Sequence, residues 1–162
     1  MLIRPMRETD LEAVGKLWLA LAEYHRHLAP EMPIPAPDGI ARYTAHLAYR
    51  LDDVLCCAFV AEEAGEVVGY VTGMVLDIMP DVFVEERAGM IGDIYVIPEQ
   101  RGRGTAKALL SATLDWFRLC DVGYYEWYVA SANVNGRAFW QKMGGQDVMV
   151  RMRAPIEGDD RT

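Results

Sequence analysis

The chain has 162 residues, of which 52% are hydrophobic and 25% charged, and its formal net charge is −8 at pH 7. This length suffices for one domain with a full hydrophobic core, and the acidic charge disfavours nucleic acid as a partner. No run of residues approaches the ~20 apolar positions of a membrane span, and residues 1–10 lack the apolar stretch of a signal peptide. We therefore expect a cytoplasmic protein that binds neither nucleic acid nor membrane.

The apolar periodicity predicts a strand over residues 2–5 and helices over 10–27 and 38–51. Residues 30–37 are too rich in proline for a helix or a central strand, so they should form an exposed loop. Strands over 54–62 and 67–76 follow, joined by a turn that contains Gly65. The first half of the chain is thus predicted to place two helices before a hairpin.

The second half is predicted to alternate strands and helices. After an acidic connector at 77–87, strands are expected at 91–96, 124–130 and 148–152, with helices from 106 onward and at 135–143. The resulting order, β-α-α-β-β-β-α-β-α-β, indicates an α/β fold with a mixed central sheet flanked by helices. One domain should span residues 1–155, leaving 156–162 as a polar tail.

A glycine loop lies between the strand at 91–96 and the helix that follows. Glycines let the backbone approach an anion, and the first turn of a helix offers unpaired N–H groups and the positive end of its dipole. The basic side chains of the loop add positive charge. The loop therefore predicts a site for a diphosphate, formed by Arg101, Gly102, Arg103, Gly104, Thr105 and Ala106.

Other glycine motifs do not fit this loop. A dinucleotide fingerprint needs a third glycine where Lys107 stands, and a P-loop needs serine or threonine after its lysine, where Ala108 stands. An RNA-binding interpretation of the R-G-R-G tract is opposed by the helical sequence that follows and by the acidic net charge. What fits is [Q/R]-x-x-G-x-[G/A], read from Arg101 through Gly104 to Ala106.

Two segments together carry a family resemblance. Residues 91–110, I-G-D-I-Y-V-I-P-E-Q-R-G-R-G-T-A-K-A-L-L, resemble the coenzyme A-binding core of the GNAT superfamily of N-acetyltransferases. Residues 129–145 resemble the family's strand–Asn–helix element, N-x6-[FY]-Y-x-K-x-G, with Asn133, Phe139, Trp140, Lys142 and Gly144 in register. Two motifs in the right order are more specific than either alone.

The resemblance implies an enzyme that transfers an acetyl group from acetyl-CoA to a primary amine by direct attack. It implies that two neighbouring strands splay apart, so that the backbone of Ile94, Tyr95 and Val96 binds the pantetheine arm. It further assigns the Val96 N–H to the thioester oxygen, and Asn133, Trp140 and Lys142 to the coenzyme site.

Asp93 is the leading candidate for handling the amine proton, because a primary amine of pKa roughly 10.4 arrives protonated. The segment I-G-D-I-Y-V-I-P-E resembles the E-D-I-Y-V-M-P-E pattern of polyamine acetyltransferases, but Gly92 stands where that pattern has glutamate. A structural aspartate that accepts hydrogen bonds from nearby loops is the open alternative.

Trp140 departs from the family pattern at a catalytic position. Many members have a tyrosine here, thought to protonate the departing thiolate, whereas an indole N–H donates a hydrogen bond without a usable pKa. A thiol of pKa roughly 8.5 is nonetheless a tolerable leaving group. The replacements at Gly92 and Trp140 leave open a second function, a catalytically impaired acetyl-CoA-binding or sensing module.

The acceptor is predicted from charge and from the resemblance. An acidic field attracts cations such as a polyamine, an aminoglycoside or a lysine-containing peptide, although acidic surfaces also simply keep proteins in solution. In the family the first two helices and the loop that connects them line the acceptor pocket, which implies Tyr24, His25, Glu31 and Tyr43 here. The sequence suggests no metal site, and the resemblance is compatible with a homodimer.

Overall fold

The computed structural model describes residues 1–77, 82, 86–154 and 156. No helix among these residues is long and apolar enough to cross a membrane. The elements in chain order are β1 (Leu2–Pro5), the 3-10 turn η1 (Glu8–Asp10), α1 (Leu11–Leu28), α2 (Gly39–Leu51), β2 (Cys56–Glu63), β3 (Glu66–Asp77), β4 (Arg87–Val96), the 3-10 turn η2 (Pro98–Gln100), α3 (Thr105–Leu119), β5 (Tyr125–Trp127) and α4 (Val134–Lys142).

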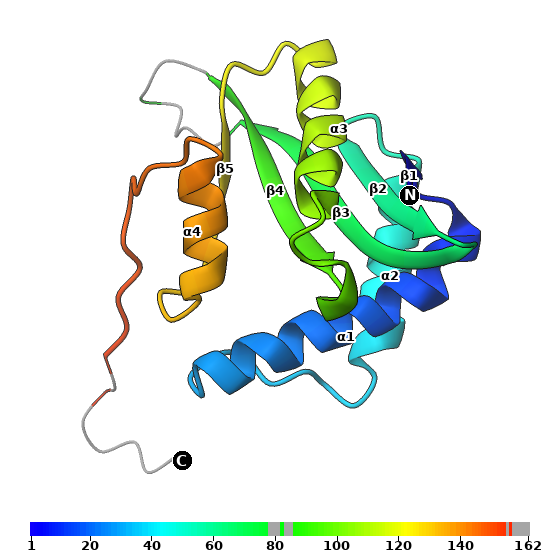
Figure 1. Ribbon diagram of the computed structural model, residues 1–162. Helices are drawn as coiled ribbons and strands as arrows, with labels where there is room; N and C mark the ends of the chain where they lie inside the picture. Colours follow the sequence, from blue (N-terminus) through cyan, green and yellow to red (C-terminus); the bar gives the residue numbers. More distant parts are fainter. Residues whose placement is uncertain (78–81, 83–85, 155, 157–162) are drawn as a thin grey trace.

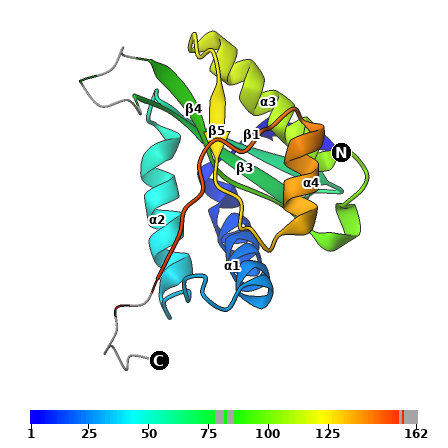
Figure 2. The same cartoon turned by 90° about the vertical axis from the view of Figure 1, so that its left-hand side faces the viewer.

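The strands form a five-stranded sheet in the order β1-β2-β3-β4-β5. The first four strands pair antiparallel, and β5 joins β4 in parallel, which confirms the predicted mixed sheet. Helices α1 and α2 lie on one side of the sheet and α3 and α4 on the other (Figures 1 and 2). The α/β fold class predicted from the sequence is therefore correct.

The predicted final strand at 148–152 is wrong. Residues 145–154 form no strand, and the side chains of Val148, Met149 and Met152 are more than three-quarters exposed. The predicted strand at 124–130 shortens to the three residues of β5, which pair with β4 alone. A short apolar run forms a strand only where a neighbouring strand pairs with it. Much of the predicted acidic connector and the tail lies outside the described residues.

Two apolar clusters fill the two faces of the sheet. Under α3 and α4, buried side chains of the sheet and the helices pack together, including Val71, Ile91, Val96, Leu110 and Trp140. Under α1 and α2, a second cluster includes Val14, Leu47, Val60, Tyr70 and Tyr95. Because Ile91 and Val96 belong to one cluster and Tyr95 to the other, β4 is covered on both faces.

A β-bulge in β4 decides which face Asp93 occupies. Ile94 pairs with Val71 and Ile91 with Gly73, so Gly92 and Asp93 together oppose the single residue Thr72. The Thr72 hydroxyl accepts the Asp93 N–H at 3.0 Å. In an unbroken strand Asp93 would share a face with Ile91, in the cluster under α3, because side chains alternate. The bulge turns it instead toward α1 and α2.

Removing the Thr72 hydroxyl tests the bulge. Thr72→Val keeps the shape of this buried side chain but leaves the Asp93 N–H without its acceptor, which should lower the free energy of unfolding by about 1–3 kcal/mol. Thr72→Ser retains the acceptor and serves as the control. Urea unfolding measures both variants, and equal losses would show that the hydroxyl does not hold the bulge.

Candidate active site

The glycine loop adopts a conformation that only glycine reaches without strain. Gly102 and Gly104 have φ of 75° and 87°, and an added Cβ would meet nothing within 4 Å at either position. Backbone conformation, not lack of space, therefore requires glycine here. Gly104 is the N-cap residue of α3, and the buried Thr105 hydroxyl donates to the Gln100 carbonyl at 3.3 Å.

The first turn of α3 carries groups that can bind an anion. Its leading N–H groups have no partner within the helix, and they lie at the positive end of the helix dipole. Arg101, Arg103 and Lys107 expose their side chains around the same turn. A diphosphate fits this combination of left-handed glycines, open amides and basic side chains.

The strands β4 and β5 separate beside this loop. Their pairing ends at Ile91 with Trp127, so the remainder of β4 has no partner from β5. The Ile97 N–H donates to the Val68 carbonyl on β3, and alternate residues point the opposite way. The backbone groups of Ile94 and Val96 therefore face the open side of β4, where an extended amide-bearing chain can hydrogen-bond.

Arg101 connects this open edge to α1. Its Nε donates to the Val96 carbonyl at 3.0 Å, and its guanidinium lies 5.4 Å from the ring centre of Tyr24 and 5.5 Å from that of Tyr95. The Tyr24 hydroxyl in turn lies 3.4 Å from Asn133 Oδ1. Residues that the sequence separates widely are thus brought together beside the loop.

The second predicted segment is placed by α4. Asn133 is its N-cap, and its Oδ1 accepts the Gly136 N–H at 2.9 Å. Trp140 is buried in the core and stacks on Trp127 with ring centres 4.2 Å apart. Lys142 is exposed in the last turn. Asn133 therefore joins the Arg101 cluster, whereas Trp140 packs into the core beneath it.

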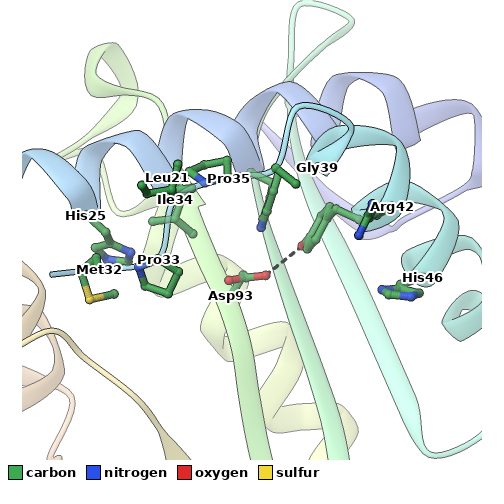
Figure 3. A pocket seen from close by; sticks show the side chains of 14 residues that line it. Leu21, His25, Met32, Pro33, Ile34, Pro35, Gly39, Arg42, His46 and Asp93 are labelled. Carbon is green, nitrogen blue, oxygen red and sulfur yellow. Dashed lines mark hydrogen bonds between the residues drawn. The ribbon is translucent and has the colours of Figure 1, made fainter. Parts of the chain in front are cut away.

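A cavity of about 510 Å³ lies between α1, the proline-rich loop, α2 and β4 (Figure 3). Of the four residues predicted for the acceptor pocket, His25 and Tyr43 line this cavity, whereas Tyr24 and Glu31 do not. Tyr24 is engaged with Arg101, and the exposed Glu31 offers its carbonyl to Arg153 at 2.8 Å. The rotation of α1 explains why Tyr24 does not line the cavity, because residues 18, 21, 22 and 25 share one stripe of that helix, whereas Glu31 lies beyond its end.

Asp93 lies at the floor of this cavity. The Tyr43 hydroxyl donates to its carboxylate at 2.9 Å, and the Tyr43 ring stacks on Trp18 at 4.9 Å (Figure 3). Asp93 also lines a second hollow of about 170 Å³ on α2's side, with Arg50 and Thr72. The Asp93 carboxylate is therefore oriented by the Tyr43 hydroxyl and by the β4 bulge, and it faces the cavity.

Burial is the main influence on the pKa values of Asp93, His25 and Tyr43. Desolvation raises the pKa of Asp93 above its usual range, while the Tyr43 hydrogen bond and the charges of His25 and Arg50 lower it. Desolvation likewise lowers the pKa of His25, against the opposing effect of Asp93. Burial and Asp93 hold the pKa of Tyr43 well above its usual range, so this phenol remains a hydrogen-bond donor.

Sequence reasoning missed several residues that line these cavities. Arg42, His46 and Arg50 recur every four residues, which places them along one stripe of α2, and this spacing was visible in the sequence. Thr72 could not be found this way, because a bulge leaves no periodic signal. Trp18 packs against the core under α1 and α2, and its ring also forms part of the cavity wall.

The model of the acetyltransferase (GNAT) family matches residues 21–145. The chain belongs to this family. The protein is accordingly an N-acetyltransferase that uses acetyl-CoA. Its glycine loop and the open edge of β4 fit this cofactor. No curated protein sequence matches it.

Solved structures share the GNAT fold. A mutant of the BH1408 protein from Bacillus halodurans is 19% identical, with a TM-score of 0.83 over 96% of this chain and 99% of that one. The ribosomal-protein-alanine N-acetyltransferase of Brucella melitensis biovar Abortus 2308 is 22% identical, with a TM-score of 0.67 over 96% and 100%. The aminoglycoside N-acetyltransferase AAC(6')-Iy, in complex with CoA, is 19% identical, with a TM-score of 0.71 over 96% and 93%.

Coenzyme A affinity should depend on the left-handed glycine at the start of α3. Gly104→Ala forces a Cβ into that conformation, a strain of roughly 1–2 kcal/mol, so we expect about tenfold weaker CoA binding by calorimetry. Gly123→Ala, also in open space but without a left-handed φ, is the matched control. Unchanged affinity in the Gly104 variant would remove the loop from the coenzyme site.

Proposed function

We propose that this GNAT enzyme acetylates a primary amine, carried by a small molecule or a lysine-containing peptide, that is bound above Asp93. The observation that carries the proposal is the placement of this carboxylate at the floor of a cavity and on the strand whose open edge adjoins the glycine loop. Acetyl donor and amine would then meet across β4. Bound acetyl-CoA supplies an activated acetyl group and a thiol leaving group.

The coenzyme site we propose combines the loop and the open edge. The loop from Arg101 to Ala106 holds the diphosphate, and the backbone of Ile94, Tyr95 and Val96 holds the pantetheine arm. Asn133, Trp140 and Lys142 complete the site from α4, Asn133 through its contact with Tyr24. In this proposal the loop binds the charged part of the coenzyme, and the backbone of β4 binds its uncharged, extended part.

Asp93 handles the proton of the acceptor in this proposal. A primary amine has a pKa of roughly 10.4 and binds as an ammonium ion, which pairs with the Asp93 carboxylate. The raised pKa of Asp93 brings the carboxylate closer to the amine in proton affinity, which favours transfer. Tyr43 steadies the carboxylate throughout, because its hydroxyl donates and does not ionise.

Val96 stabilises the developing charge on the thioester oxygen. Its N–H faces the open side of β4, three residues beyond Asp93 in the bulge. A single backbone donor of this kind is typically worth ~10²–10³ in rate. Trp140 contributes packing and at most one hydrogen bond, so the thiolate leaves without proton donation from that position.

The second candidate function, an acetyl-CoA-binding or sensing module, predicts a sealed Asp93. The carboxylate instead lines two hollows, and its neighbours Tyr43 and Thr72 fix its direction. A buried structural aspartate needs no such opening. The cavity therefore supports catalysis over sensing.

Asp93→Asn should lower kcat/KM for the amine by at least ~10²-fold, because the amide cannot accept the proton. The affinity for CoA should not change, and burial of a neutral amide should not destabilise the fold at neutral pH, where ionisation of Asp93 is costly. Thiol release and calorimetry measure the two effects. Asp115→Asn, an exposed position on α3, is the control. Full activity in the Asp93 variant would contradict the proposal.

Tyr43→Phe should move the acid limb of the pH profile. The Tyr43 hydrogen bond favours ionised Asp93, so its loss raises the pKa of that carboxyl further and shifts the limb of kcat/KM to higher pH. Above that limb, the variant should retain more activity than Asp93→Asn. A profile that does not move would show that Asp93 ionisation does not control the rate.

A further inference from the structure

The protein is strongly acidic as a whole, but the lining of its proposed acceptor cavity is not. The chain as a whole carries −8, yet among the 14 described residues that line the larger cavity Asp93 is the one carboxylate. The smaller hollow beside it adds no other acidic side chain from the described residues. The acidic field of the protein thus attracts cations to the molecule, whereas the cavity itself can neutralise one ammonium ion.

Most of the cavity wall is apolar. One part comes from α1, with the ring of Trp18, and another from the connecting loop, which carries the Met32, Pro33, Ile34 and Pro35 side chains labelled in Figure 3. Ile34 lies on that loop, and its side chain is 72% exposed. The apolar lining residues are Trp18, Leu21, Ala22, Met32, Pro33, Ile34, Pro35 and Ala36. Such a wall favours a hydrocarbon skeleton over further charged or hydroxyl groups.

The opposite wall carries basic side chains. Arg42 and His46 line the larger cavity, and His46 and Arg50 line the smaller one. Arg42 is paired with Asp38 at 2.8 Å, whereas Arg50 acts electrostatically on Asp93. A second ammonium group on the acceptor would therefore meet positive charge on this side and hydrocarbon on the other.

Gly92 shows why no second acid stands beside Asp93. It lines the smaller hollow without a side chain, and a Cβ there would approach Thr72 Oγ1 to 2.8 Å. That oxygen accepts the Asp93 N–H. A glutamate at this position would disturb the bond that aims Asp93, so the bulge favours a single carboxylate.

We propose that the acceptor is a monoamine on an apolar skeleton, an alkyl- or arylalkylamine, rather than a polyamine or an aminoglycoside. This inference rests on the proposed function and narrows its substrate class. The single ammonium pairs with Asp93, while the skeleton lies between Trp18 and the proline-rich loop. About 510 Å³ is in the lower part of the range for ligand pockets, about 300–1,000 Å³, which suits a small amine.

Matched amines test the inference with the intact enzyme and acetyl-CoA. Hexylamine and hexamethylenediamine differ by one terminal ammonium, and phenethylamine, spermidine, kanamycin and a lysine peptide complete the panel. We expect kcat/KM at least ~10-fold higher for hexylamine than for hexamethylenediamine, because the second charge is desolvated without a partner. Preference for the diamine, spermidine, kanamycin or the peptide would overturn the inference while leaving acetyl transfer intact. No turnover with any amine would overturn the proposed function as well.

A variant that adds a second carboxylate to the cavity wall tests the inference from the side of the protein. Ile34→Asp puts an acid on the exposed cavity wall, where it can pair with the far ammonium of hexamethylenediamine. The hexylamine-to-diamine ratio should then fall about tenfold, whereas Ile34→Asn, equally polar but uncharged, should leave the charge preference nearly intact. Equal ratios in the two variants would place the acceptor away from Ile34 and contradict the proposal.

Discussion

The hydrogen bond from the Asp93 N–H to the Thr72 hydroxyl is the constraint on which the site depends. It closes a bulge that reverses the alternation of β4, so that Ile91 and Ile94 both face the cluster under α3. Without that reversal, Asp93 would place a carboxylate in an apolar core, at a cost that no partner there offsets. With it, the same side chain reaches a cavity and a phenol donor.

Because of the bulge, the edge of β4 and one of its faces present different groups. The open edge left by β5 presents backbone groups next to the glycine loop, while the face toward α1 and α2 presents Asp93. Arg101 joins the two regions through Val96 and Tyr24. Donor and acceptor can thus be held by separate parts of the protein, with one short stretch of strand common to both.

The sequence predicted the fold class and the loop well, because both follow from strong periodicity and from glycine chemistry. Asp93 was singled out from its position next to the loop motif, and its role stays a prediction. The final strand was wrong because the short apolar run at residues 148–152 cannot indicate whether a neighbouring strand is present to pair with it. The cavity walls were only partly found, since whether Tyr24 or His25 faces inward depends on the rotation of α1 by a single residue. Thr72 and the bulge leave no pattern in the sequence at all.

The protonation of Asp93 in the folded enzyme tests the account most directly. Its carboxyl ¹³C signal can be assigned by comparison with Asp93→Asn and followed against pH. We expect a midpoint above the ordinary value of about 3.9, because burial raises it, and a shift to lower pH when a monoamine binds, because the ammonium favours the carboxylate. A midpoint at the ordinary value that no amine moves would show that Asp93 neither lies in a desolvated site nor meets the acceptor.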